Sequence, residues 1–313
     1  METTHSHSHL ADVSTQTGTR IVISLVVTLC FVLIEAIAGY WANSLALLTD
    51  AAHNLTDVLA LGLSWYAIQL AARPSSPRRT YGYHRVGILI ALFNSTTLVV
   101  IALGIFYEAY QRLITPGQVQ AETLTIVAAI AFLVNAGTAW LVQRGSESDL
   151  NLRSVFVHLA SDAVSTFAAI IAGIGIALTR MVWLDPLVSI FIGLLILWNG
   201  WSIIRETMGI LLEGTPRDVD LNDILTDLVD IEGVRGVHDL HVWSITQNMR
   251  SLSAHIATDD ISISQSIPIR DKINDVLYHK YSIAHATLQF ECVDCDPMTL
   301  YCDLEQANQK YKT

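Results

Sequence analysis

Charged side chains are scarce in this 313-residue chain: Asp, Glu, Lys and Arg make up 15% of it, against about 25% in an average soluble domain. The shortage is concentrated in residues 20–212, where apolar residues crowd together, whereas the remainder of the chain reads as a soluble acidic domain. Length and this shift in composition predict two units, one in lipid and one in water.

Basic residues are also in short supply, since 18 Lys and Arg stand against 29 Asp and Glu and give a net charge of −11. This balance argues against a nucleic-acid partner, because a phosphate-binding surface needs clustered Lys and Arg. The N-terminal arm lacks the basic region and cleavage site of a secretory signal peptide, so we expect no such peptide. Only four cysteines occur. Three of them lie close together, which favours metal binding in a reducing compartment over a disulfide framework.

Six apolar runs have the length of about 20 residues that is needed to cross the hydrocarbon core of a bilayer. The predicted helices cover residues 21–41, 45–71, 86–113, 124–142, 154–178 and 184–211. Arginines gather in the loops after the second and fourth helices, at Arg73, Arg78, Arg79 and Arg85 and at Arg144 and Arg153. Such an excess marks cytoplasmic loops, so we expect both termini in the cytoplasm.

From Pro216 onwards the pattern indicates a water-soluble fold. Helical periodicity covers residues 220–231 and 264–281, and alternation covers 238–245, 251–258 and 285–291. The order α-β-β-α-β predicts an α+β domain with a small sheet. The expected division of the chain is a His-rich cytoplasmic arm (1–19), a six-helix transmembrane domain (20–212), a cytoplasmic domain (213–291) and a Cys-containing tail (292–313).

The second and fifth predicted helices each carry a polar stripe with the pattern H-x-x-x-D, as His53 with Asp57 and His158 with Asp162. The spacing places both residues of a pair on one helix face. An ionised carboxylate at a helix centre in lipid costs on the order of 2.5–3.5 kcal/mol, so the two helices need a shared polar interior. A divalent cation supplies it, since two His nitrogens and two Asp oxygens suit tetrahedral zinc and the two Asp charges balance the ion.

Half a site on each helix means that relative helix motion can make or break the site, as a transporter requires. The alternative is that each His bonds its own Asp and only fixes helix packing. Two matching pairs in one bundle disfavour that alternative.

Five further segments point to a known family: SLALLTDAAH at 44–53, YGYHR at 81–85, DLNLR at 149–153, LLEG at 211–214 and VHDLHVW at 237–243. With the two pairs, they resemble the cation diffusion facilitator family, in its bacterial zinc, cobalt and cadmium efflux branch. The resemblance implies a homodimer of six-helix protomers in the bacterial inner (plasma) membrane, with a ferredoxin-like or metallochaperone-like cytoplasmic domain. It also implies exchange of cytoplasmic Zn²⁺ for protons by alternating access.

The same resemblance implies the roles of several residues. The transport ligands correspond to His53, Asp57, His158 and Asp162. Asp50, one turn closer to the outer face, is interpreted as an exit-path residue or a neighbour of the site, with helix packing as the alternative.

Further metal ligands are expected outside the membrane. The resemblance implies a peripheral site at His84, against a solvated loop His, and cytoplasmic ligands at His238, His255 and Glu291. His285 shares a strand face with Glu291, although His241 and His285 can instead be structural. Cys292 and Cys295 have chelate spacing, and Cys302 follows. The arm residues His5, His7 and His9 form a metal-capturing tract by composition, against a disordered arm of weak affinity.

Proton coupling follows from the ligand types. Free histidine titrates near pH 6.5, and metal binding needs neutral imidazole and ionised carboxylate, so protons compete for the same residues. Cobalt or cadmium as the main substrate stays open, because ligand softness argues only against manganese. Two rivals belong to other classes. A catalytic zinc in an intramembrane metalloenzyme keeps an open coordination position, whereas all four ligands expected here come from the protein, which disfavours that class. A metal sensor without transport has no need of ligands at mid-membrane depth, which disfavours the second.

Overall fold

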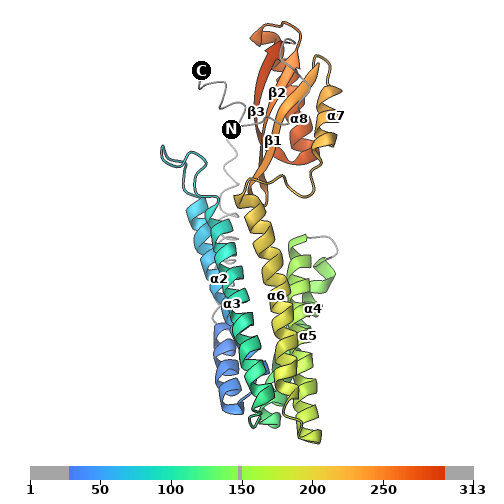
Figure 1. Ribbon diagram of the computed structural model, residues 1–313. Helices are drawn as coiled ribbons and strands as arrows, with labels where there is room; N and C mark the ends of the chain where they lie inside the picture. Colours follow the sequence, from blue (N-terminus) through green and yellow to red (C-terminus); the bar gives the residue numbers. More distant parts are fainter. Residues whose placement is uncertain (1–27, 147–149, 293–313) are drawn as a thin grey trace, which may run out of the picture. The chain divides into compact units, whose positions relative to one another are not determined.

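The computed structural model describes residues 28–146 and 150–292 (Figure 1). The His-rich arm with His5, His7 and His9, and the tail residues Cys295 and Cys302, lie outside this range. The chain forms two compact units. One comprises Met1–Trp65 and Phe93–Ile203, and the other comprises Tyr66–Leu92 and Ile204–Thr313.

The first unit is a bundle of helices. After an apolar helix described over Thr28–Ala42 come α2 (Leu45–Ala71), α3 (Val86–Ile114), α4 (Ala121–Ser146), α5 (Leu150–Thr179) and α6 (Leu184–Leu211). The end of α2, the start of α3 and the end of α6 belong to the second unit. Within the described ranges, α3 to α6 are long and apolar enough to cross a membrane. The helical transmembrane domain predicted from composition is thus confirmed. Its six spans stay a prediction, because the polar stripe of α2 lowers its hydropathy and the first helix is described only from Thr28.

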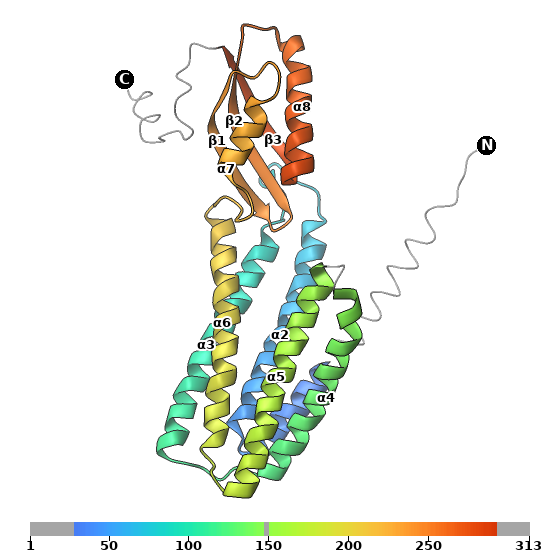
Figure 2. The same cartoon turned by 90° about the vertical axis from the view of Figure 1, so that its right-hand side faces the viewer.

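Small side chains let the helices of this unit approach closely. Its buried core includes Ala46 on α2, Ala102 on α3, Ala128 on α4 and Ala169 on α5. Gly173 on α5 packs against α4, where a Cβ atom would collide with Thr125, and Figure 2 shows these two helices side by side. Large apolar side chains such as Leu133, Leu178 and Trp198 point outwards and are 70%, 80% and 79% exposed, as expected for a lipid-facing surface.

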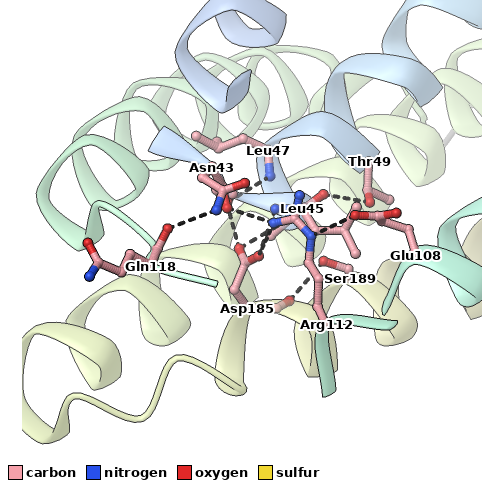
Figure 3. Close-up of polar contacts among 11 residues, drawn as sticks. Asn43, Leu45, Leu47, Thr49, Glu108, Arg112, Gln118, Asp185 and Ser189 are labelled. Atoms are coloured by element: carbon pink, nitrogen blue, oxygen red, sulfur yellow. Dashed lines mark hydrogen bonds and ion pairs between the residues drawn. The ribbon is translucent and has the colours of Figure 1, made fainter. Parts of the chain in front are cut away.

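The start of α2 is held by a carboxylate from another helix (Figure 3). Asp185, in the first turn of α6, is completely buried. It accepts hydrogen bonds from Ser44 Oγ at 2.5 Å and from the backbone N–H groups of Leu45 at 2.6 Å and the next residue at 3.2 Å. Arg112 of α3 donates to the carbonyl oxygen of Asn43 at 2.7 Å. The first N–H groups of a helix have no partner within it. Ser44 is the N-cap of α2, since its Oγ accepts from the N–H of Leu47 at 3.3 Å, and Asp185 accepts from the two N–H groups that precede Leu47.

The second unit contains the cytoplasmic domain, built in the predicted order from α7 (Leu221–Val229), β1 (Gly236–Thr246), β2 (Met249–Thr258), α8 (Ile263–Tyr281) and β3 (Ile283–Cys292). The sheet order is β1-β2-β3, with β1 and β2 antiparallel and β2 and β3 parallel. Leu228 of α7 and Leu277 of α8 join Leu240, Leu252 and Ile256 of the sheet in one core. The predicted α+β class is confirmed.

Candidate metal centre

The four residues of the two H-x-x-x-D pairs lie together inside the first unit. His53 and Asp57 project from α2, and His158 and Asp162 project from α5. His53 Nε2 lies 3.5 Å from Asp57 Oδ2 and 3.5 Å from Asp162 Oδ1. His158 Nε2 lies 3.4 Å from Asp57 Oδ2 and 3.5 Å from Asp162 Oδ2. Each histidine therefore faces the aspartate of the other helix as closely as its own.

The His–Asp separations are close to the distance between neighbouring ligand atoms around a zinc ion. Ligand bonds of about 2.0–2.2 Å place neighbouring ligand atoms roughly 3.4 Å apart. The His–Asp contacts are 3.4–3.5 Å, which is long for a hydrogen bond. His53, His158 and Asp162 each offer one ligand atom within 4.8 Å of the others, and Asp57 Oδ2 lies 3.5 Å and 3.4 Å from the two histidines.

Because this cluster is partly buried, the charges of its carboxylates must be balanced. The side chains of His53 and Asp162 are 12% and 8% exposed, whereas those of Asp57 and His158 are 30% and 46% exposed. In the described part of the chain, the ion pairs of Asp57 and Asp162 are with these histidines and with no Lys or Arg. Two carboxylates without a basic partner need protons or a cation for neutrality.

Asp50 does not belong to this cluster of four. It is buried on α2, and Asn54 Nδ2 donates to its Oδ2 at 3.2 Å. The same amide donates to Glu35 Oε2 on the first helix at 3.4 Å. The sequence interpretation missed Glu35, although an acidic residue in an apolar helix is itself a signal of a partner.

A second cluster lies on the cytoplasmic sheet. His238 Nε2 is 3.1 Å from Glu291 Oε2, and His255 Nδ1 is 3.0 Å from Glu291 Oε1. The ring centroids of the two histidines are 5.1 Å apart, since His238 and His255 are cross-strand partners. Two imidazoles and one carboxylate make a donor set that suits zinc with one further ligand. The buried Nδ1 of His238 has no hydrogen-bond partner among the described residues.

A β-bulge brings two more residues to this face. Residues three apart on a regular strand point to opposite faces, but His238 pairs with His255 and His241 pairs with Ser253, so both histidines share a face. The extra residue is Asp239, with φ of 50°. Its carboxylate lies 2.9 Å from His241 Nε2 and 3.4 Å from His255 Nε2. Asp239 was missed because alternation alone does not reveal a bulge.

Other predicted ligands lie apart from both clusters. His285 pairs with Ser251, whereas Glu291 pairs with Ala257, so they are separated by six residues, or about 20 Å of strand. His285 instead stacks edge-on with Tyr81 and lines a pocket with His84. The Sγ atom of Cys292 lies 3.9 Å from Asp260 Oδ1. In the described part of the chain, neither His84, His285 nor Cys292 joins a group of three metal-binding side chains.

Fold and sites together define a helical membrane protein with a cytoplasmic α+β domain and clustered metal-binding side chains. The family described as the cation efflux transmembrane domain matches residues 21–212, and the family described as the cation efflux protein, cytoplasmic domain, matches residues 216–293. The chain belongs to this cation efflux family, the cation diffusion facilitators, and is an integral membrane protein that transports metal cations.

Relatives agree along nearly the whole length. The cadmium, cobalt and zinc/H(+)-K(+) antiporter of Bacillus subtilis is 38% identical over 87% of this chain and 88% of its own. The zinc transporter ZitB of Yersinia pseudotuberculosis is 35% identical over 92% and 91%. A solved structure, the metal-bound C-terminal domain of the CzcD transporter from Cupriavidus metallidurans, is 31% identical over 23% of this chain and 99% of its own, with a TM-score of 0.21.

Proposed function

We propose that this chain exports zinc from the cytoplasm through the site formed by His53, Asp57, His158 and Asp162. The observation that carries the proposal is the 3.4–3.5 Å spacing of the four ligand groups across two helices. Two imidazoles and two carboxylates give the nitrogen and oxygen donors that zinc accepts in a tetrahedron. Their two negative charges balance a divalent ion in a medium where an unbalanced charge is costly.

We further propose that zinc leaves in exchange for protons. Zinc binding needs both histidines neutral and both aspartates ionised, so protons arriving at the same residues displace the metal. Because α2 and α5 each contribute one His–Asp pair, a small relative movement of the two helices separates the halves and releases the ion. The Bacillus subtilis relative, named as an antiporter of metal against protons and potassium, supports an exchange of this kind.

We propose a homodimer in the bacterial inner membrane with both termini in the cytoplasm. The arginines between α2 and α3, together with Arg144 at the end of α4 and Arg153 at the start of α5, support this orientation. The family matched by the cytoplasmic domain is named for dimerisation, which supports pairing through that domain. Chemical cross-linking in native membranes, followed by sizing of the products, tests the dimer, and purely monomeric protein would contradict it.

Transport into sealed vesicles tests the zinc site. The variants His53→Ala, Asp57→Ala, His158→Ala and Asp162→Ala are each reconstituted beside wild type, and zinc uptake is followed with and without an imposed pH gradient. Each variant is expected to lose transport. The exposed residues His279 and Asp275 provide matched controls, since H279A and D275A remove the same chemical groups away from the site. Full transport by the four site variants would refute the proposal.

Cobalt or cadmium as the principal substrate is the second candidate. It is favoured by the name of the Bacillus subtilis relative, which includes cadmium and cobalt beside zinc. Competition of each metal against zinc uptake, in the same vesicles, ranks the three ions. A preference for cobalt or cadmium would replace zinc as the substrate and leave the four ligands in place.

The cytoplasmic cluster is proposed to hold a further zinc ion through His238, His255 and Glu291. The full chain with both H238A and H255A should bind fewer zinc ions at equilibrium than wild type, as counted by elemental analysis after dialysis. H279A serves as the histidine control. An unchanged count in the double variant would remove this site.

A further inference from the structure

Two acidic side chains meet inside the first unit, away from the four proposed zinc ligands. Glu35 of the first helix and Asp50 of α2 are 0% and 3% exposed, and both carboxyl groups lie within hydrogen-bonding distance of the same side-chain amide. The amide of Asn54 donates to one oxygen of each, at 3.4 Å and 3.2 Å. The remaining oxygens, Glu35 Oε1 and Asp50 Oδ1, are buried with no hydrogen-bond partner among the described residues.

The surroundings cannot neutralise two ionised carboxylates. In the described part of the chain, no Lys or Arg forms an ion pair with either Glu35 or Asp50. The charged groups that face them are His53, on the same helix as Asp50, and Asp162 of α5. Asp162 adds negative charge, and His53 is itself shared with Asp57 and Asp162. Two adjacent buried carboxyl groups of this kind avoid double ionisation by sharing a proton.

A shared proton also accounts for the two oxygens left without a partner. One carboxyl group then donates its O–H to the other, while Asn54 donates to the second oxygen of each. The three side chains form a closed polar unit, as buried polar groups require. Asp50 lies about one helical turn from His53 along α2, since residues at i and i+3 lie on the same face. A charge at the metal site therefore interacts electrostatically with the carboxyl pair, although neither acid is among the four ligands.

We propose that Glu35 and Asp50 form a proton-sharing carboxyl pair, separate from the zinc ligands, that carries a counter-transported proton. The idea rests on the proposed zinc–proton exchange and adds a second place for protons to bind. Arrival of a divalent cation at the neighbouring site favours the ionised form of the pair and releases its proton to water. Departure of the cation favours uptake of a proton again. The coupling acts through charge, so it does not require the proton and the metal to occupy the same atoms.

Proton counting in reconstituted vesicles tests this pair. Wild type, Glu35→Gln and Asp50→Asn are compared with Glu122→Gln, which makes the same chemical change at an exposed acid of α4. A trapped pH-sensitive dye reports protons moved per zinc ion. Both pair variants are expected to move fewer protons per zinc than wild type and to respond less to an imposed pH gradient. Their zinc affinity should fall by less than about tenfold, the lower limit for loss of a group that orients a ligand.

Variants that move the wild-type number of protons would overturn the carboxyl pair while leaving zinc–proton exchange intact. A wild type that is itself indifferent to the gradient would instead refute the exchange. Infrared difference spectroscopy on wild type guards against misfolded variants. The zinc-free protein should show carbonyl absorption of protonated carboxylic acids that decreases on zinc binding. A component of this absorption should be shifted or lost in both pair variants and unchanged in Glu122→Gln. Absence of such a component from wild type would also overturn the pair.

Discussion

Replacing Asp185 by Ala should destabilise the helical unit more than any single surface change. The Asp185 carboxylate is completely buried and accepts three hydrogen bonds at the start of α2, from Ser44 Oγ and two backbone N–H groups. Hydrogen bonds to a charged group contribute about 1.5–3 kcal/mol each, and loss of a side chain that accepts from the first N–H groups of a helix costs about 1 kcal/mol. These contributions overlap, so we expect a loss on the order of 3–5 kcal/mol, as for other broken buried charge contacts.

A graded series of variants separates the carboxylate from the space it fills. Ser44→Ala removes one donor and should cost about 1 kcal/mol. Asp185→Asn keeps the volume and one acceptor oxygen, so its effect should lie between those of Ser44→Ala and Asp185→Ala. The free energy of unfolding is measured for the full chain in mixed micelles with increasing denaturing detergent. The exposed Asp275, changed to Ala, is the control.

Zinc binding at the proposed site provides a second measurement of the same contacts. Asp185 holds the helix that carries His53 and Asp57, two to three turns further along, so a loosened N-terminus should also weaken zinc binding. A free energy of unfolding for Asp185→Ala no lower than that of the Asp275 control would refute the reasoning. It would mean that α2 finds other acceptors for its first N–H groups.

Three further predictions concern packing and pH. Gly173→Val should destabilise the pairing of α4 and α5 by on the order of 1–3 kcal/mol because any side chain collides with Thr125, measured by the same detergent titration. Leu252→Ala removes a completely buried side chain from the cytoplasmic core, so it should lower the free energy of unfolding by about 2–5 kcal/mol, measured by thermal unfolding of the full chain followed by circular dichroism. Hydrogen bonds from Arg250 lower the pKa of Asp218, so the stability lost in Asp218→Asn should be present at pH 7 and vanish as pH falls below about 4. A difference that persisted at lower pH would contradict this assignment.

The length of the apolar runs predicted most of the bundle, because the apolar residues of a membrane-crossing segment usually coincide with its helical hydrogen bonding. The predicted α4, residues 124–142, falls short of the observed Ala121–Ser146, and the predicted α5, residues 154–178, falls short of Leu150–Thr179. The additional turns are polar, since residues 143–146 read Gln-Arg-Gly-Ser. Hydropathy measures how much of a helix lies in lipid, whereas backbone hydrogen bonds continue into the water-exposed ends. Hydropathy therefore locates the membrane-crossing spans better than the helix ends.

The four proposed zinc ligands were predictable because their spacing is local. Residues at i and i+4 share a helix face in any α-helix, so His53 with Asp57 and His158 with Asp162 were paired from the sequence. On the cytoplasmic sheet the same reasoning reaches only part of the site. Asp239 and its bulge change which residues share a face, and that depends on the register against β2, which no local pattern specifies.

The two missed acids, Glu35 and Asp185, show where local pattern stops being informative. Glu35 has no polar neighbour at helical spacing in its apolar helix, and Asp185 has only Ser189, so no pair of metal-binding side chains singles out either acid. Both acids nevertheless require a partner, because a buried ionisable group in a membrane is costly when it is unpaired. Glu35 meets it through Asn54 and Asp50, and Asp185 through the unpaired N–H groups of α2. Both partners lie on α2, the helix that also carries half of the proposed zinc site. An isolated acid in a transmembrane helix therefore predicts that a partner exists, but only the fold identifies that partner. In this chain the partner of each acid lies on or next to α2, the helix that would move in the proposed transport cycle.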